Sequence, residues 1–569
     1  MQGTSVHTMP RRAWLLAGAI SLLALALRLW GNGFGLPYTT EPDEPKLVHH
    51  ALAIGLGDPN PHYFVYPALQ MYLLFLCYGG LFLALLAQGA VQSVEDYKLL
   101  FLSDPTVFYQ VGRALTAVFG AATVALMPLA GLRLYGSLSA GMLAALALAV
   151  HPIHVPQSHL VTADVPVTFF LLGGLVLAAR LRDRPGAREG ILAGAAAGLA
   201  TAIKYSGLIL LAPIAAALLG PLRRRPFPWR TALCVVAALA GAFALLSPYS
   251  LVEWRQTLDG MRFISDVKRD GQFGVARGPS WGTYFRQSFL AGPLTLATLA
   301  GVVLAAMRRT PADVLLLSFA VPYFLLVGAS QSHSPRYLVP LLPVYVLLAA
   351  RLAVAAWRRP AWRPVTAAAA AAALLVALAA TVVRLRDLTL PDTRQAAREW
   401  IESRVPDGST VALEWGWDDT VRLPESAESL DEKIRRYEAA AARPDAAVLG
   451  ALRLLRRQPS DGPRYRVVRI GENVGNVLRK RRQDTDELRR LGVEYVVTST
   501  AALGDPAGAA FRRAYPEIAA FYERLPREAE LLRRFEASAG ALRGPTISIF
   551  RLSDRKPAPA GVGTGSAGQ

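Results

Sequence analysis

The sequence predicts a polytopic α-helical membrane protein that carries a soluble α/β domain at its C-terminal end. Three observations support this fold class. The 569 residues are 53% hydrophobic and only 18% charged. The apolar residues gather in long runs, and short basic clusters separate these runs. Such a composition excludes a disordered chain and disfavours an ordinary soluble enzyme.

The apolar runs are long enough to be membrane spans, since a helix needs about 20 apolar residues to cross a hydrocarbon core of ~30 Å. The first run follows Arg11 and Arg12 and lacks an Ala-x-Ala pattern, so we interpret it as an anchor and not as a cleaved signal peptide. About twelve candidate spans occupy residues 13–31, 67–89, 108–131, 138–151, 165–181, 190–203, 207–222, 231–247, 287–307, 313–330, 338–357 and 365–384.

The excess of basic residues predicts the orientation of these spans. The formal charge is +19, and only seven of the 61 basic residues are lysine. Nucleic acid is one possible reason for such an excess, but its place between apolar runs favours cytoplasmic loops. The clusters on this side are residues 180–188, 223–230, 308–309 and 357–363. Loops 32–66, 152–164, 248–286 and 331–337 then lie outside, with everything after residue 385.

The parity of the spans does not close between residues 67 and 151. Either one run in this interval fails to span, or one further crossing exists, so about twelve and about thirteen spans are both open. Cys77 and Cys234 lie inside apolar runs, so the sequence contains no disulfide framework and no cysteine metal site.

After the last apolar run the composition becomes mixed. Residues 408–414 and 493–499 have the pattern of strands, and residues 392–401, 431–441 and 485–491 have that of helices. We therefore divide the chain into three parts. These are a transmembrane domain of residues 1–384, an extracytoplasmic α/β domain of residues 385–555 and a disordered tail of residues 556–569.

The first external loop carries two adjacent carboxylates, Asp43 and Glu44, between prolines. They could form the acidic first turn of a helix, which is the commoner role of such a pair, or a catalytic site at the membrane surface. The same loop continues with His62, Tyr63 and Tyr66. Their rings suit contacts with a sugar or an acceptor, although aromatic residues at a bilayer interface also serve as anchors.

Further charged residues lie where other apolar runs begin or end. Asp164 could cap a helix or act in a site, and His151, His154 and His159 nearby have no metal-binding motif. Lys204 lies inside an apolar stretch, where it either snorkels to the surface or meets a lipid phosphate. Arg336, at the mouth of a span, is either a headgroup anchor or an anion contact, and Arg113, inside a span, needs a partner at its depth.

In this order, the residues resemble the GT-C glycosyltransferases that use polyprenyl-phosphate sugars, namely the protein O-mannosyltransferase and aminoarabinose transferase group of family 39/83-like proteins. The resemblance covers roughly residues 13–357. Its motifs are Asp43-Glu44 followed by Tyr66-Pro67, Arg113, Asp164-Val165-Pro166, Lys204 to Gly207, and Arg336 to Pro343.

The resemblance implies that Asp43 is the catalytic carboxylate and that Glu44 and Asp164 complete an acidic patch beside the sugar. Lys204 and Arg336, and less clearly Arg113, would face the donor phosphate. It also implies inverting transfer with no nucleotide sugar and no obligatory metal or other cofactor. The sequence contains no inserted sugar-binding repeat domain, so the acceptor stays open as a glycan, lipid or protein.

We therefore expect a multi-pass inner-membrane enzyme that moves a sugar from a polyprenyl-phosphate donor to an acceptor on the outer face, with no nucleic-acid partner. The chemistry agrees, because a carboxylate can take the acceptor's proton and fixed cations can stabilise the departing phosphate. A transporter or flippase is the main alternative and predicts charges at the bilayer midplane. A membrane scaffold is another, but it leaves the Asp43-Glu44 loop unexplained.

Overall fold

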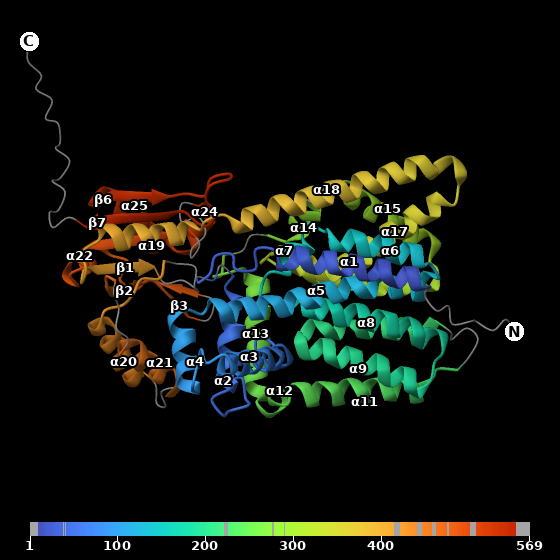
Figure 1. The fold of residues 1–569 in the computed structure, drawn as a ribbon, viewed down its shortest axis with the longest axis horizontal. Helices are drawn as coiled ribbons and strands as arrows, with labels where there is room; N and C mark the ends of the chain where they lie inside the picture. Colours follow the sequence, from blue (N-terminus) through green and yellow to red (C-terminus); the bar gives the residue numbers. More distant parts are fainter. Residues whose placement is uncertain are drawn as a thin grey trace, which may run out of the picture.

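A helical bundle and a smaller α/β domain make up the protein and lie end to end (Figure 1). The computed structural model describes residues 10–37, 39, 41–220, 226–275, 278–288, 291–414, 421–440, 446–457, 462–474, 477–500 and 508–552. The predicted fold class is therefore confirmed. The predicted tail of residues 556–569 lies outside the described residues.

Every predicted apolar run coincides with a helix. These helices are α1 (Arg11–Leu29), α3 (Leu69–Ala87), α5 (Thr106–Tyr135), α6 (Leu138–Ala149), α8 (Asp164–Asp183), α9 (Ala187–Ile203), α10 (Leu211–Leu219), α11 (Trp229–Leu246), α15 (Pro293–Arg308), α16 (Pro311–Gly328), α17 (Leu342–Trp357) and α18 (Arg363–Thr389). Within the described residues, 8 helices are long and apolar enough to cross a membrane, or up to 9 if the bent pair of α14 (Trp281–Ser288) and α15 is one span. Other runs lie on shorter helices such as α6 and α10, so the larger number of spans stays a prediction.

Helix α3 accounts for the parity problem of the sequence. Tyr66, just before α3, and Arg113, in the second turn of α5, both bind residues of the first loop, so α3 and α5 begin at the same end of the bundle. Between them lies only α4 (Val94–Ser103), whose 10 residues are too short to cross a bilayer. The Tyr97 hydroxyl on α4 donates to the Tyr78 carbonyl of α3 at 2.8 Å. We infer that α3 stays at this end, as Figure 1 shows, and is the run that does not span.

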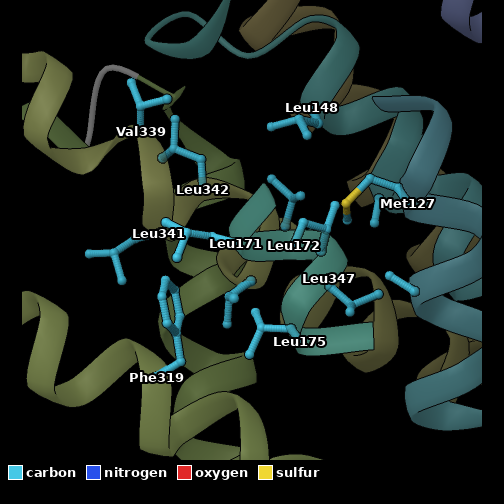
Figure 2. Close-up of a cluster of buried hydrophobic side chains, with 14 of the residues drawn as sticks. Met127, Leu148, Leu171, Leu172, Leu175, Phe319, Val339, Leu341, Leu342 and Leu347 are labelled. Carbon is cyan, nitrogen blue, oxygen red and sulfur yellow. The ribbon is translucent and has the colours of Figure 1, made fainter. Parts of the chain in front are cut away.

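The bundle is held together by a continuous apolar core. Figure 2 shows its central part, in which leucines of α8 meet Met127 of α5, Phe319 of α16 and Leu347 of α17. Helices α9 and α11 approach each other so closely that a methyl group at Gly194 would lie 2.2 Å from the Val235 carbonyl. Small residues allow such contacts, which drive helix association where lipid removes the hydrophobic driving force.

The ends of the bundle differ in character. The connections from α8 to α9, from α15 to α16 and from α17 to α18 carry three of the four predicted basic clusters and lie far from the α/β domain (Figure 1). Residues 223–225 of the fourth cluster lie outside the described residues. The opposite end carries α2 (Asp43–Ile54), α7 (His154–Gln157), α12 (Tyr249–Val252), α13 (Trp254–Asp270) and the 3-10 segments η1 (Tyr205–Leu210) and η4 (Pro335–Leu341). Polar residues at this end therefore lie close to the α/β domain.

The α/β domain is built on a five-stranded sheet of order β2-β1-β5-β7-β6. β1 (Thr410–Glu414) pairs in parallel with β2 (Arg466–Ile470) and β5 (Tyr495–Ser499), whereas β7 (Ile547–Leu552) runs antiparallel to β5 and to β6 (Ala529–Phe535). A short hairpin joins β3 (Glu472–Val474) and β4 (Val477–Arg479). The helices are α19 (Thr393–Arg404), α20 (Ala427–Ala440), α21 (Ala446–Arg457), α22 (Thr485–Arg490), α24 (Ala509–Ala514) and α25 (Pro516–Glu528).

Candidate active site

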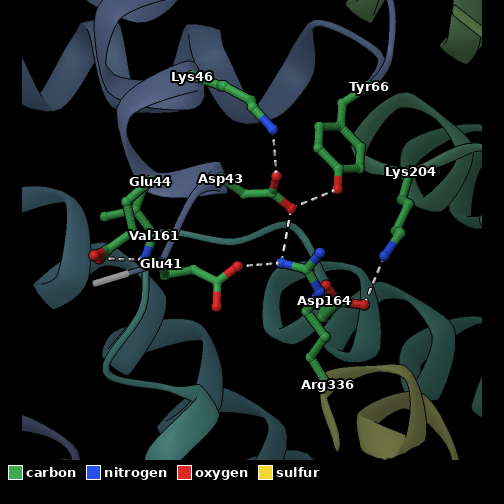
Figure 3. Close-up of polar contacts among 9 residues, drawn as sticks. All are labelled: Glu41, Asp43, Glu44, Lys46, Tyr66, Val161, Asp164, Lys204 and Arg336. Carbon is green, nitrogen blue, oxygen red and sulfur yellow. Dashed lines mark hydrogen bonds and ion pairs between the residues drawn. The ribbon is translucent and has the colours of Figure 1, made fainter. Parts of the chain in front are cut away.

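The acidic loop begins helix α2. Asp43 and Glu44 form its first turn, where carboxylates favour the positive end of the helix. The two possible roles of the pair are therefore compatible, because the helix start fixes the backbone from which both side chains project. The two side chains have separate partners, as Figure 3 shows.

Asp43 is surrounded by donors. Its Oδ1 accepts from Lys46 Nζ at 3.1 Å, and its Oδ2 accepts from the Tyr66 hydroxyl at 2.9 Å and lies 2.7 Å from Arg336 Nη1. The same Arg336 Nη1 binds Glu41 Oε1 at 2.7 Å. One guanidinium from η4 thus holds two carboxylates of the first loop, almost 300 residues earlier in the chain.

Burial and charge separate the pKa values of these two carboxyl groups. Burial raises the pKa of Glu41 from 4.5 to about 7, opposed by Arg336 and assisted by Asp43 and Glu44. Burial would raise the pKa of Asp43 too, but Arg336, Lys46 and Tyr66 outweigh it and lower that pKa below its usual value. The direction follows from the contacts, since Asp43 has three donors around it and Glu41 has one.

Glu44 lies in a different contact. Its two oxygens accept from Nε and Nη2 of Arg113, each at 2.8 Å, and Oε1 also accepts from the Val161 amide at 3.0 Å. Both side chains of this pair are 0% exposed. Arg113 Nη1 donates to the carbonyls of Asn32 and Phe34. This arrangement fastens α2 to α5 and the first loop, and it leaves neither side chain open to a substrate in this structure.

Asp164 and Lys204 form the next pair. Asp164 begins α8, Lys204 follows α9, and their Oδ1 and Nζ atoms lie 2.6 Å apart. The Lys204 ammonium lies 5.7 Å from the ring centre of Tyr66 and 5.4 Å from that of Tyr337. Because the Tyr66 hydroxyl also binds Asp43, the Asp164–Lys204 pair lies next to the Asp43 cluster. The predicted residues Asp43, Asp164, Lys204, Arg336 and Tyr66 are thereby brought to one end of the bundle (Figure 3).

The structure adds two residues that the sequence analysis did not select. Glu41 lies in the same loop two residues before Asp43, but only the fold shows that it shares Arg336 with Asp43. Lys268 on α13 lies near the Lys204 pair, since burial and then Lys204 lower its pKa. Lysine is scarce in this chain, with seven among 61 basic residues, and that scarcity is a signal that could have drawn attention to Lys268.

Several predicted contacts lie away from this cluster. His62 pairs with Asp58 at 2.7 Å and is mostly exposed. Tyr63 stacks on His50 with ring centres 4.8 Å apart but lies beside the cluster, because its ring centre is 6.2 Å from that of Tyr66. His154 binds Arg28, and His159 bonds to the carbonyls of Val155 and Trp30. The part of the chain that the structure describes contains no group of three or more His, Cys, Asp or Glu residues able to hold a metal. The absence of a metal requirement stays a prediction.

The arrangement suits a group transfer in which part of the donor departs as an anion. Carboxylates at Glu41, Asp43 and Asp164 can take a proton or stabilise positive charge, and Lys204 and Arg336 can stabilise negative charge close by. Within the described residues Arg336 Nε is buried and has no hydrogen-bond partner. A donor N–H therefore remains for a ligand.

Comparison with known proteins supports this interpretation. The sequence profile described as dolichyl-phosphate-mannose-protein mannosyltransferase matches residues 90–252, a segment that contains Arg113, Asp164 and Lys204. No significant match was found among curated protein sequences.

Solved structures match over nearly the whole chain. Apo ArnT from Cupriavidus metallidurans matches with a TM-score of 0.52 and 16% identity, covering 94% of this chain and 98% of ArnT. The same protein with bound undecaprenyl phosphate matches with a TM-score of 0.47 and 16% identity, over 95% of this chain and 98% of that one. The oligosaccharyltransferase AglB from Archaeoglobus fulgidus, solved with an inhibitory peptide and a dolichol-phosphate, matches with a TM-score of 0.51 and 12% identity, over 96% and 74%.

At these identities the likeness concerns the fold, whereas the profile match concerns the sequence itself. Together they confirm the predicted resemblance: this chain is a multi-pass membrane protein with the GT-C glycosyltransferase fold.

Proposed function

We propose that the protein transfers a sugar from a polyprenyl-phosphate donor to an acceptor outside the cytoplasm. The observation that carries this proposal is the cluster of carboxylates and cations at one end of a membrane bundle, in which Arg336 joins Glu41 and Asp43 beside the Asp164–Lys204 pair. A transporter would need its charges along a path through the bundle. The carboxylates and cations of this cluster instead lie together at the end of the bundle that carries the first loop.

The names of similar proteins support the class of donor. The matching profile is named for dolichyl-phosphate-mannose, and the AglB structure contains a dolichol-phosphate. Both are isoprenoid phosphates, whose tails dissolve in the bilayer. An enzyme that takes such a donor must meet it at the membrane, which accounts for a catalyst built from membrane helices.

The proposed reaction is an inverting displacement. The acceptor oxygen forms a bond to the anomeric carbon, and the bond from that carbon to the phosphate oxygen breaks. The electron pair leaves with the phosphate, which Lys204 and Arg336 stabilise, and the acceptor proton passes to a carboxylate. The donor is the only cofactor-like component that this reaction requires, and no metal is needed to balance it.

Two carboxylates compete for the role of base. Asp43 has both oxygens engaged by donors and stays ionised, so it suits stabilisation of the positive charge at the anomeric carbon. Glu41 uses Oε1 for Arg336, whereas its Oε2 forms no hydrogen bond or ion pair with any described residue. A pKa near 7 is also matched to proton transfer at neutral pH. We assign the base to Glu41 and keep Asp43 as the catalytic carboxylate beside it.

The topology follows from the arginine clusters. Their loops lie at the end of the bundle away from the α/β domain, which by the positive-inside rule supports a site and an α/β domain outside the cytoplasm. We propose an inner-membrane location. The acceptor is a glycan, a lipid or a protein of the cell envelope.

The experiment is a transfer assay on purified protein with a panel of radiolabelled polyprenyl-phosphate hexoses and pentoses and an envelope fraction from a deletion strain. Asp43→Asn should abolish release of polyprenyl phosphate while expression and membrane insertion stay normal. Glu95→Gln is the matched control, because Glu95 is an exposed carboxylate on α4 paired only with Lys98. A flippase, the alternative function, would move the donor across vesicles without cleaving it, and that result would overturn the proposal.

A further inference from the structure

A charged cleft lies at the end of the bundle opposite the Asp43 cluster, where α5, α8 and α15 end and α16 begins. Its volume is about 420 Å³, a size typical of ligand sites. Four arginines and one carboxylate are among its lining residues, namely Arg182, Arg308, Arg351, Arg358 and Asp183. We propose that this cleft binds the phosphate of an anionic phospholipid from the leaflet opposite the catalytic site.

One side of the cleft is fixed by a buried carboxylate, Asp313, which pairs with Arg351. Its Oδ1 also accepts from the Tyr135 hydroxyl at 2.9 Å, and its Oδ2 accepts from the amide and hydroxyl of Thr310 at 2.9 and 2.6 Å. The Arg351 guanidinium lies 4.3 Å from the Tyr135 ring centre. Both oxygens of Asp313 are therefore engaged, and its single negative charge compensates the charge of Arg351 but of no other arginine in the cleft.

The other arginines retain positive charge. Arg182 binds Asp183 through Nε at 2.9 Å and Nη2 at 2.8 Å, but its buried Nη1 has no partner among the described residues. The side chains of Arg308 and Arg358 are exposed and form no ion pair with any residue that the structure describes. Asp183 compensates one of these three charges, so the cleft has a surplus of positive charge and an N–H group directed to no protein atom.

The orientation of the spans does not by itself require the arginines to cluster around a cleft. Arginines that only orient spans can project separately into water. Here they come from three different helices, α8, α15 and α17 with its C-terminal residue Arg358, and surround a cleft between membrane helices. Basic clefts of this kind bind anionic headgroups. Trp357 and Met307, next to Arg358 and Arg308, are 47% and 76% exposed, as expected of residues that face lipid.

The test uses the full-length protein in neutral detergent and native mass spectrometry with phosphatidylglycerol, phosphatidylcholine or inorganic phosphate. We expect retained phosphatidylglycerol and little phosphatidylcholine. The variant Arg182→Gln/Arg308→Gln/Arg358→Gln should weaken phosphatidylglycerol binding about tenfold or more, as loss of charge-assisted contacts predicts. Arg309→Gln is the matched control, since Arg309 is the neighbouring exposed arginine, donates to the Ala306 carbonyl at 3.1 Å and does not line the cleft.

Equal retention of both lipids, or equal loss in the Arg309→Gln control, would overturn the proposal. Displacement of phosphatidylglycerol by millimolar inorganic phosphate would assign the cleft to a free phosphate and overturn its assignment to lipid. A thermal unfolding curve unchanged in the triple variant excludes misfolding as the cause of lost binding. The readout is binding, so its outcome is independent of whether Asp43 and Glu41 catalyse transfer.

Discussion

The sharpest prediction concerns the pH dependence that Glu41 gives to the reaction. Burial raises the pKa of Glu41 to about 7, and the base acts only when it is ionised. The ionised fraction then rises from about one tenth at pH 6 to about nine tenths at pH 8. We expect kcat/KM to rise about tenfold over this interval, because this ratio reports groups of the free enzyme. Asp43, whose pKa is lowered, stays ionised throughout.

The perturbation is Glu41→Gln, which keeps the size of the side chain and an oxygen for Arg336 but removes the proton acceptor. The loss of a general base lowers the rate about 10²- to 10⁴-fold, and the remaining activity should lose its rise around pH 7. The assay is transfer of radiolabel from the donor, measured from pH 5.5 to 8.5, with Glu95→Gln as the control that keeps the wild-type profile. A Glu41→Gln variant that retains the same pH profile would refute the assignment of the base.

Other predictions follow from the remaining charged groups. Glu44→Gln should destabilise the protein by about 3–5 kcal/mol in thermal unfolding, because it leaves Arg113 buried without its charged partner. The double variant Glu44→Leu/Arg113→Met should recover much of this loss, because it removes both buried charges. Equal loss in both variants would contradict a structural role for the pair. Lys204→Met should lower kcat/KM roughly 100-fold by removing ~3 kcal/mol of stabilisation from the leaving phosphate, and Lys204→Arg should retain part of it; a normal rate in Lys204→Met would exclude this contact. Burial raises the pKa of Glu414 from 4.5 to about 7. Between these values Glu414 stays protonated in the folded state but loses its proton in the unfolded state. The stability of the protein therefore falls as the pH rises from about 4.5 to 7. Glu414→Gln should therefore stabilise the protein at pH 8, by about 3 kcal/mol at most, and a melting temperature with unchanged pH dependence would contradict this.

The helices of the bundle and several elements of the α/β domain could be predicted from local patterns. Apolar length alone located every run that the structure shows as a bundle helix, and short runs with the pattern of strands located β1 and β5. Strand β6 was missed because its sequence, Ala-Glu-Leu-Leu-Arg-Arg-Phe, has no regular alternation of apolar and polar residues. It is a strand because β7 offers it hydrogen bonds, which is a tertiary reason.

The candidate site could be predicted in part. Asp164, Lys204 and Arg336 were selected because charges in or beside apolar runs are costly and need partners. Asp43 was selected as one of two adjacent carboxylates between prolines in the first external loop. Their pairing was not readable, since Arg336 reaches Glu41 and Asp43 across most of the chain, and α8 and α9 bring Asp164 to Lys204. Adjacent residues received opposite environments for the same reason: Asp43 faces the cluster, whereas Glu44 is one helical step of about 100° away and faces Arg113.

The sequence by itself determined that the chain enters the membrane, how its basic loops are distributed and which charged residues needed an explanation, because these depend on composition and on local periodicity. Only the tertiary structure decided which carboxylates share one guanidinium and which acid faces away from their cluster, and only its contacts gave a reason to infer which run fails to cross. Those outcomes depend on contacts between segments far apart in the chain, and no local pattern encodes a distance between them.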